Sequence, residues 1–345
     1  MQRRRPGEQK WERRTDAAIG LMAVSRVRSH ARVTGPLIAR AADIPALNTV
    51  FSDAFTERYR RDGMTGVRVP FLNPSIWLYS VEDAAGGALV WRDERDEIVA
   101  FNMVHQSGVE GWMGPLSVRP DRQGRGLGKE IVRAGVERLK ANGATTIGLE
   151  TMPRTMDNIG FYSSLGFIPG PLTITLTLEG MVSERAPYLL GSLSRNDKKT
   201  AIAQCGALTS ALMPGYDFGR ELLITDTLNI GETVLMWRAG RIVGMALCHC
   251  VSLVEGRIAE EMRVLKLVLE READLEQFAR TLADYARRRS AQRVAFRVQT
   301  EYLSAYERLV AMGARVRWTD LRMTLTGFGE AKAKGGGLVW SNWEI

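Results

Sequence analysis

GPLSVRPDRQGRGLGKEIV, residues 114–132, is the most informative stretch of this sequence. Its first residues are typical of a β-strand that ends at Val118, and its last residues predict a helix that starts near Leu127. The turn between them holds three glycines, Gly124, Gly126 and Gly128. Small residues let a backbone approach a ligand closely, and the N–H groups and dipole of a helix start favour a negatively charged group there. The stretch therefore predicts an anion-binding turn.

Two familiar anion-binding motifs do not fit this turn. A P-loop would need glycine five residues before Gly128 and Ser or Thr after Lys129, but the sequence has Gln123 and Glu130. A dinucleotide fingerprint would need glycine in place of Lys129 and an opening strand–helix–strand unit. What remains is the pattern Gln-x-x-Gly-x-Gly at Gln123, Gly126 and Gly128.

The segments around the turn predict a mixed α/β domain. Upstream we expect a strand at Pro36–Arg40, a helix over residues 44–60, and β-rich runs at Ile76–Val81, Ala88–Arg92 and Ile98–Gln106. The strand Trp112–Val118 leads into the turn. Downstream we expect a helix at Lys129–Asn142, a strand at Thr145–Glu150, a helix at Asp157–Leu165 and a strand at Leu172–Leu178.

The second half repeats this plan in outline. Its predicted elements end with a strand at Val294–Gln299, a helix at Tyr302–Met312 and a strand at Trp318–Thr326. Gly313, just after that helix, lies 147 residues after Gly166, an interval close to a whole domain, so we interpret the chain as a duplication. The predicted parts are a basic flexible leader (1–33), a first domain (34–182), a degenerate second domain (183–329) and a C-terminal tail (330–345) whose tryptophans pack on the body.

Composition narrows the class of protein. The 345 residues are 45% hydrophobic and 25% charged, with no long apolar run and no secretory signal, so we expect a cytoplasmic protein without a membrane partner. Much of the net charge of +8 lies in residues 1–33. We interpret that leader as a solvated arm, or as an overlong start with Met22 as an alternative initiator, rather than as an RNA-binding tail.

The cysteines predict neither disulfides nor a metal site. Cys205, Cys248 and Cys250 cannot form a fully paired framework, and their number suits a reducing compartment. Cys248-His249-Cys250 lies in a strand-like run, where alternation sends His249 to the face opposite the two cysteines, and no second ligand pair follows. We therefore expect no bound metal.

The glycine turn, together with FYSSLGF at Phe161–Phe167, resembles the acyl-CoA motif and the closing tyrosine motif of the GCN5-related N-acetyltransferases (GNAT). The resemblance covers residues 34–180 well and the second half in outline. It implies two tandem GNAT folds, each a mixed, mostly antiparallel sheet flanked by helices, with acetyl-CoA as cosubstrate. The cofactor-binding residues that it implies are Leu116, Ser117, Val118, Gln123, Gly124, Arg125, Gly126, Leu127, Gly128 and Lys129. Arg122 can add to the positive field.

The resemblance also implies catalytic groups. Tyr162, four residues before the glycine of the LGF turn, matches the tyrosine that protonates the departing thiolate, since acetyl transfer needs such an acid and a neutral amine. The family's glutamate, eleven residues before the motif glutamine, is here Trp112, and Glu110 is the expected substitute as base. Glu150, His105 and a water chain are alternatives. A further departure is Thr155, where the family often has asparagine, and Asn158 is a candidate replacement.

The second half lacks this equipment. Its strand RVLKLVLE (263–270) is followed by READLEQF, which has no glycine, so its helix start cannot approach phosphates as closely. The position that matches Tyr162 is Leu309, with Tyr306 one turn earlier. We therefore expect a silent second domain that shapes the acceptor cleft.

These expectations combine into one function. The chain is predicted to be an N-acetyltransferase that acts on a small-molecule amine by direct attack in a ternary complex. The alternatives are a CoA-binding sensing or scaffold module without turnover, and an acetyltransferase directed at protein or RNA. The sequence does not indicate the oligomeric state.

Overall fold

The computed structural model describes residues 32–184 and 186–343. The predicted basic leader (1–33) lies outside the described residues, except for its last two positions. Residues Val33–Ile345 form one compact unit. No helix in the described part is long and apolar enough to cross a membrane.

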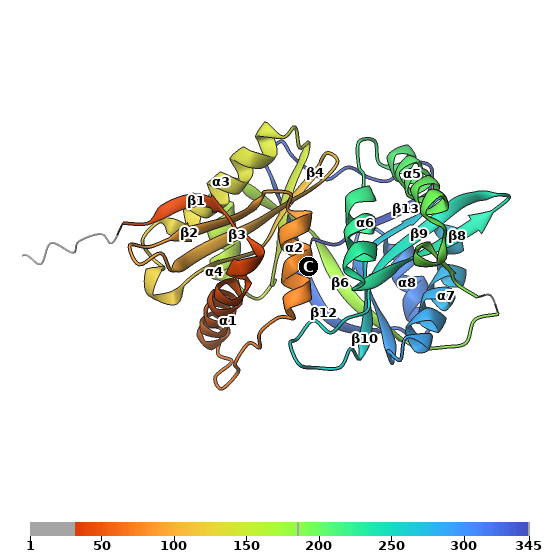
Figure 1. The fold of residues 1–345 in the computed structure, drawn as a ribbon, viewed down its shortest axis with the longest axis horizontal. Helices are drawn as coiled ribbons and strands as arrows, with labels where there is room; N and C mark the ends of the chain where they lie inside the picture. The colour runs from red at the N-terminus through yellow and green to blue at the C-terminus, as the bar shows by residue number, and fades with distance from the viewer. Residues whose placement is uncertain (1–31, 185, 344–345) are drawn as a thin grey trace, which may run out of the picture. The chain divides into compact units, whose positions relative to one another are not determined.

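Thirteen strands of the described residues form one sheet (Figure 1). They are β1 (Thr34–Ile38), β2 (Ala88–Arg92), β3 (Ile98–Ser107), β4 (Glu110–Val118), β5 (Thr146–Thr151), β6 (Phe167–Glu179), β7 (Tyr188–Leu189), β8 (Gly231–Arg238), β9 (Arg241–His249), β10 (Glu261–Leu269), β11 (Arg293–Gln299), β12 (Arg315–Leu325) and β13 (Leu338–Ser341). Their order is β1-β2-β3-β4-β5-β12-β6-β11-β10-β9-β8-β7, with β13 paired to β10. The pairs β4–β5 and β10–β11 are parallel and the others antiparallel.

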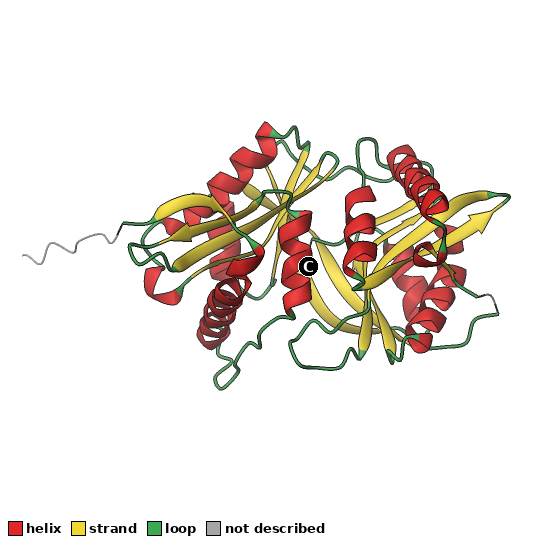
Figure 2. Cartoon of the chain, viewed as in Figure 1, coloured by secondary structure: helices red, strands yellow, loops and turns green. Residues whose placement is uncertain are grey.

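Helices cover both faces of the sheet (Figure 2). They are α1 (Ile44–Arg61), α2 (Pro74–Asp83), α3 (Leu127–Ala141), α4 (Met156–Ser163), α5 (Arg195–Leu212), α6 (Gly219–Leu228), α7 (Leu275–Arg288) and α8 (Leu303–Ala311). Alternate residues of β2 show the two faces: Ala88 and Val90 pack with α1 and α2, whereas Leu89 and Trp91 pack with α3. In the second half, α5 and α6 pack in one core and α7 and α8 in the other. The predicted fold class, a mixed and mostly antiparallel sheet flanked by helices, is confirmed.

The two halves exchange their last long strands. The last long strand of the second half, β12, pairs with β5 of the first half, and β6 of the first half pairs with β11 of the second. Strands β6 and β12 pair with each other at the centre (Figure 1). One continuous sheet therefore runs through both halves, and the boundary at 182/183 stays a prediction.

The element order of the first half returns in the second, as the duplication hypothesis expects. Each of α3, β5, α4 and β6 has a counterpart about one domain later, in α7, β11, α8 and β12. Glu150 and Arg297, which are 147 residues apart, occupy matching positions under this alignment. They form an ion pair with each other.

The predicted strand at Ile76–Val81 is wrong, because these residues belong to helix α2. Asn73 caps that helix by accepting a hydrogen bond from the Ser75 N–H (3.0 Å), and Pro74 is its first residue. Ile76, Trp77 and Tyr79 are all buried, so packing overrides the β-like composition of this short run. Helix α6, which packs on α2, is absent from the sequence-based predictions.

Two local predictions about the second half are confirmed. Cys248 packs with the core of α7 and α8, whereas the His249 ring contacts the Tyr79 ring on the other face (centroids 4.5 Å apart). The tail tryptophans, Trp340 and Trp343, are 2% and 1% exposed and pack on the body. No group of three potential metal ligands occurs among the described residues.

Candidate active site

Strand β4 leaves its neighbour β5 halfway along its length. The two strands pair in parallel only over Glu110–Met113 and Thr146–Leu149. On the other side, the register between β3 and β4 shifts between Met113 and Leu116, which leaves one extra residue on β4. Such a bulge bends the strand. Beyond it, the edge of Leu116–Val118 that faces β5 pairs with no other described strand, so a slot opens there.

The glycine turn lies at the end of this slot. Gly124 and Gly126 adopt left-handed conformations (φ +74° and +88°), and Gly126 precedes the first residue of α3. Gln123 ties the turn to β4 by donating from Nε2 to the Val118 carbonyl (2.9 Å). Among the described residues, no acceptor faces the backbone N–H groups of residues 124–128. An anion is the natural partner for such a set of N–H groups at a helix start.

Two cations remain exposed beside the turn, Arg125 and Lys129. Arg122, expected to join them, instead donates to the Asp93 carboxylate (2.9 Å). Burial favours protonation of Asp93, but the N–H groups of residues 95 and 97 and nearby arginines lower its pKa below the usual value. Arg122 therefore braces the loop and Arg125 and Lys129 supply the positive charge.

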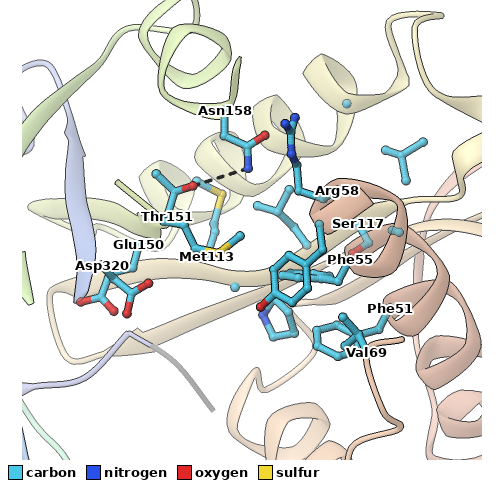
Figure 3. Close-up of a pocket in the computed structure, with 18 of the residues that line it drawn as sticks. Phe51, Phe55, Arg58, Val69, Met113, Ser117, Glu150, Thr151, Asn158 and Asp320 are labelled. Carbon is cyan, nitrogen blue, oxygen red and sulfur yellow. Dashed lines mark hydrogen bonds between the residues drawn. The ribbon is translucent and has the colours of Figure 1, made fainter. Parts of the chain in front are cut away.

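The slot opens into a cavity of about 530 Å³ (Figure 3). Five of the predicted cofactor-binding residues line it: Leu116, Ser117, Val118, Gln123 and Gly128. The other five, Gly124, Arg125, Gly126, Leu127 and Lys129, do not. The Ser117 hydroxyl is buried in this wall and has no hydrogen-bond partner in the described structure. A buried hydroxyl of this kind fits an amide-bearing arm, so the residues present suit an acyl-CoA.

Tyr162 reaches the cavity wall from α4. Its side chain packs between Phe161 and Phe167, with ring centroids 5.2 and 6.2 Å away. Burial raises the pKa of Tyr162 well above its usual value. The phenol therefore keeps its proton at neutral pH, as an acid must before it donates.

Glu110, the expected base, does not line the cavity. It is 1% exposed, and its two oxygens accept hydrogen bonds from the Ser341 hydroxyl (2.6 Å) and the Trp343 indole (2.8 Å). His105, an alternative base, is also buried away from the cavity, where it bonds to Asp83 (2.7 Å) and stacks on Trp112 (4.0 Å). The geometry favours neither residue as a base.

Two carboxylates do line the cavity, Glu150 from β5 and Asp320 from β12 (Figure 3). Glu150 accepts hydrogen bonds from Thr173 (2.6 Å), Arg322 (2.8 Å) and Arg297. Burial alone would raise the pKa of Glu150, but the two arginines lower it below its usual value. Asp320 also bonds to Arg297 (3.1 Å). Both carboxylates therefore belong to a charged belt that crosses the central strands.

Asn158, not Thr155, faces the cavity. Thr155 is fully buried, and its hydroxyl bonds to Asp62 (3.2 Å). Asn158 lines the wall and lies within 3.5 Å of the Thr151 hydroxyl, as the dashed line in Figure 3 marks. Asn158 as a replacement for the family's asparagine therefore stays a prediction.

The cavity wall also contains residues that the sequence did not indicate. Helix α1 contributes Phe51, Phe55, Arg58 and Tyr59, and the second half contributes Leu253, Val254, Trp318, Asp320 and Trp343. No local motif marks the second group. Trp318, Asp320 and Trp343 reach the first-half site because β12 pairs with β5 and the Trp343 ring packs on Gly148 of β5. Leu253 and Val254 lie on the loop after β9, which bonds to residues 72 and 73.

The second half does not repeat the turn. Its helix start, at Glu272–Asp274, carries acidic groups, and Asp274 is held by Arg238 (2.8 Å) and Arg271 (2.9 Å). Leu309, the counterpart of Tyr162, is fully buried in the core. An acidic helix start repels a phosphate, and a leucine cannot donate a proton.

Comparisons with known proteins agree with this geometry. Residues 46–167 match the family model of the acetyltransferase (GNAT) family. No curated protein sequence matches the chain. Among solved structures, a candidate acetyltransferase from Pyrococcus horikoshii is 16% identical with a TM-score of 0.63, covering 91% of this chain and 94% of its own.

Two further structures resemble most of the chain. A GCN5-related N-acetyltransferase from Sphaerobacter thermophilus is 17% identical (TM-score 0.54) and covers 85% of this chain and 94% of its own. A tandem GNAT protein from the clavulanic acid biosynthesis pathway is 12% identical (TM-score 0.53), with coverages of 85% and 98%. At these identities the likeness establishes the fold alone.

Proposed function

Because residues 46–167 form a domain of the GNAT acetyltransferase family, we propose that the chain is an N-acetyltransferase that uses acetyl-CoA and a small-molecule amine. The two substrates meet in a ternary complex, and the amine attacks the thioester directly. One arrangement carries the proposal. Strand β4 separates from β5, a turn with free backbone N–H groups follows it, and the adjoining cavity is lined by Tyr162.

Each part of the site has a task in this reaction. The turn and the exposed Arg125 and Lys129 bind the diphosphate, and the free edge of Leu116–Val118 pairs with the amide-bearing arm. Acetyl-CoA supplies the activated acetyl thioester. Tyr162 gives its proton to the departing sulfur, and holding both substrates in one cavity lowers the entropic part of the barrier.

One observation favours a second candidate function. The cavity-lining carboxylates, Glu150 and Asp320, are both engaged by arginines, and Glu110 is bonded to the tail. Water therefore acts as the base, or the amine reacts from its neutral fraction without one, or else the chain binds CoA without turnover. CoA release that no amine stimulates, despite acetyl-CoA binding, would favour the binding module.

The first test is calorimetric titration of the protein with acetyl-CoA. We expect one site per chain, and loss of binding in Gly126→Glu, because a carboxylate at that position would repel the diphosphate. Gly143→Glu is the matched control, since Gly143 also has a positive φ and open space around it but lies at the other end of α3. The control should bind normally. Absence of binding by the wild type would contradict the proposed function.

The remaining alternatives have their own readouts. An RNA-directed enzyme predicts salt-sensitive RNA binding that is lost when residues 1–33 are deleted. A protein-directed enzyme predicts acetylation of peptides in preference to free amines. The cytoplasmic location also stays a prediction.

A further inference from the structure

We propose that the C-terminal segment Leu338–Trp343 is the built-in occupant of the second half's cofactor slot and that this docking places Trp343 as an acceptor-specificity residue in the first-half cavity. The second part of the inference rests on the proposed function. The first part rests on strand pairing alone.

The second half contains the same slot as the first. Strand β10 pairs in parallel with β11 only over Glu261–Arg263, as β4 does with β5 over Glu110–Met113. Its register against β9 then shifts between Val264 and Lys266, which leaves an extra residue at the counterpart of the β4 bulge. Leu267–Leu269 therefore corresponds to Leu116–Val118.

In the second half this slot is filled by the chain itself. Strand β13 pairs antiparallel with β10, with Leu338 opposite Leu269 and Trp340 opposite Leu267. Just before β13, the Gly336 carbonyl accepts a hydrogen bond from the Glu272 N–H (3.1 Å), at the helix start that corresponds to the glycine turn. The tail thus takes both the strand position and one N–H that a cofactor would use.

Buried polar contacts fix the end of the tail. Lys266 Nζ donates to the Ser341 hydroxyl (2.7 Å), which donates to Glu110 Oε2 (2.6 Å). The Asn342 N–H bonds to the Leu265 carbonyl (2.9 Å). Because Lys266 and Glu110 are only 2% and 1% exposed, these contacts are shielded from water, and the carboxylate expected to act as a base serves as an anchor instead.

Trp343 is thereby presented to the first-half site. Its indole donates to Glu110 Oε1 (2.8 Å), and the Arg322 guanidinium lies over its ring (3.5 Å). The ring lies directly on Gly148 of β5, where an added Cβ would come within 2.2 Å of it. Gly148 pairs with Trp112, next to the point where β4 and β5 separate. Trp343 thus lines the cavity at the end of the slot where β4 and β5 come together.

The direction of the slot assigns this wall to the acceptor side. Strands β4 and β5 separate after Met113, and the glycine turn follows Val118, five residues later. Five residues of extended strand span roughly 17 Å. A cofactor whose diphosphate sits at the turn therefore brings its thioester toward the convergent end. The indole of Trp343 and the carboxylates of Glu150 and Asp320 surround the place where an amine must approach.

Hydrogen exchange of the full-length protein tests the occupied slot. We expect slow exchange at Leu267–Leu269 with or without acetyl-CoA, and protection of Leu116–Val118 only when acetyl-CoA is added. Fast exchange at Leu267–Leu269 that acetyl-CoA slows would overturn the inference. Failure of acetyl-CoA to protect Leu116–Val118 would instead count against the proposed function, so the two failures are distinguishable.

Trp343→Ala tests the wall, with Trp340→Ala as the control. Both changes remove a buried tail tryptophan, but Trp340 faces the core of α7 and α8 and does not line the cavity. On a panel of primary amines from methylamine to tryptamine, Trp343→Ala should raise KM for small amines about tenfold and shift preference toward bulkier ones. Acetyl-CoA affinity should not change. If the two variants and the wild type cannot be distinguished on any amine, the inference fails.

Discussion

At the scale of single residues, burial sets the protonation state of Tyr162, the proposed proton donor. The aromatic rings of Phe161 and Phe167 surround it, and the same desolvation that raises its pKa keeps the proton on the phenol. The phenol is therefore in its protonated form when the thiolate departs, as a proton donor must be.

Tyr162→Phe should therefore lower kcat on the order of 100-fold, because only the proton donor is removed. Acetyl-CoA affinity, measured by calorimetry, should remain close to that of the wild type. Tyr306→Phe, at the neighbouring position of the second half, is the control and should leave both quantities unchanged. An unaltered rate in Tyr162→Phe would remove the acid role.

A second residue predicts how stability depends on pH. Burial, with the charge of Asp83 adding to it, raises the pKa of Glu221 to about 7, while the Ser107 hydroxyl donates to its carboxylate. The native state thus holds a proton that the unfolded state, with an ordinary glutamate pKa of 4.5, has lost. The contribution of Glu221 to stability is present below pH 4.5 and is lost as the pH rises to about 7.

Glu221→Gln should remove that loss, since an amide keeps a hydrogen bond to Ser107 and does not titrate. Urea unfolding at pH 5 and pH 8 measures the effect. We expect the free energy of unfolding of the wild type, relative to the variant, to be lower at pH 8 than at pH 5. An identical difference at both pH values would contradict the buried, protonated state of Glu221.

At the scale of elements, helix α3 lies very close to the sheet. An added Cβ at Gly135 would come within 2.5 Å of the Met113 sulfur and 2.7 Å of the Asn102 amide, which is itself bonded to the Ile131 carbonyl. Glycine thus allows the helix that starts at the turn to sit directly on β3 and β4, and that contact fixes the turn relative to the slot.

Gly135→Ala should destabilise the protein by about 1–2 kcal/mol, because the overpacking outweighs the better helix propensity of alanine. Gly160→Ala on α4 is the matched control, since nothing lies within 4 Å of its added Cβ. That variant should be neutral or slightly more stable. Chemical denaturation measures both, and a stabilised Gly135→Ala would show that α3 is not held this closely.

At the scale of the molecule, the exchange of β6 and β12 makes the halves interdependent. Without the second half, β5 would lose its partner β12 and β6 would lose both of its sheet neighbours, β11 and β12. Unpaired central strands expose backbone groups and apolar surface.

A fragment of residues 33–182 should therefore fail to fold by itself, and the whole chain should unfold in a single thermal transition. Circular dichroism of the fragment and calorimetry of the full chain measure these outcomes. Two separate transitions, or a fragment with a cooperative melt of its own, would mean that each half is stable without the exchanged strand.

The sequence by itself determined most of the first-half elements and the glycine turn between β4 and α3. The turn is encoded locally, because Gly124 and Gly126 need left-handed backbone and Leu127 starts a periodic helix within a few residues. Tyr162 was indicated by the resemblance of FYSSLGF to the closing tyrosine motif of the GNAT family. The placement of Cys248 and His249 on opposite faces follows from strand alternation. The sequence did not predict helix α2, because its composition favours a strand and tertiary packing overrides that preference.

Only the tertiary structure decided which distant residues complete the site. Asp320, Trp318 and Trp343 join Glu150 because β12 and the tail pair with strands far from them in sequence. The same pairing brings the tail to Glu110, the predicted base, whose two oxygens accept hydrogen bonds from Ser341 and Trp343. Strand pairing over such separations depends on the packing of the whole sheet, and no short sequence pattern specifies it, so the second-half wall of the cavity could not be predicted from local signals.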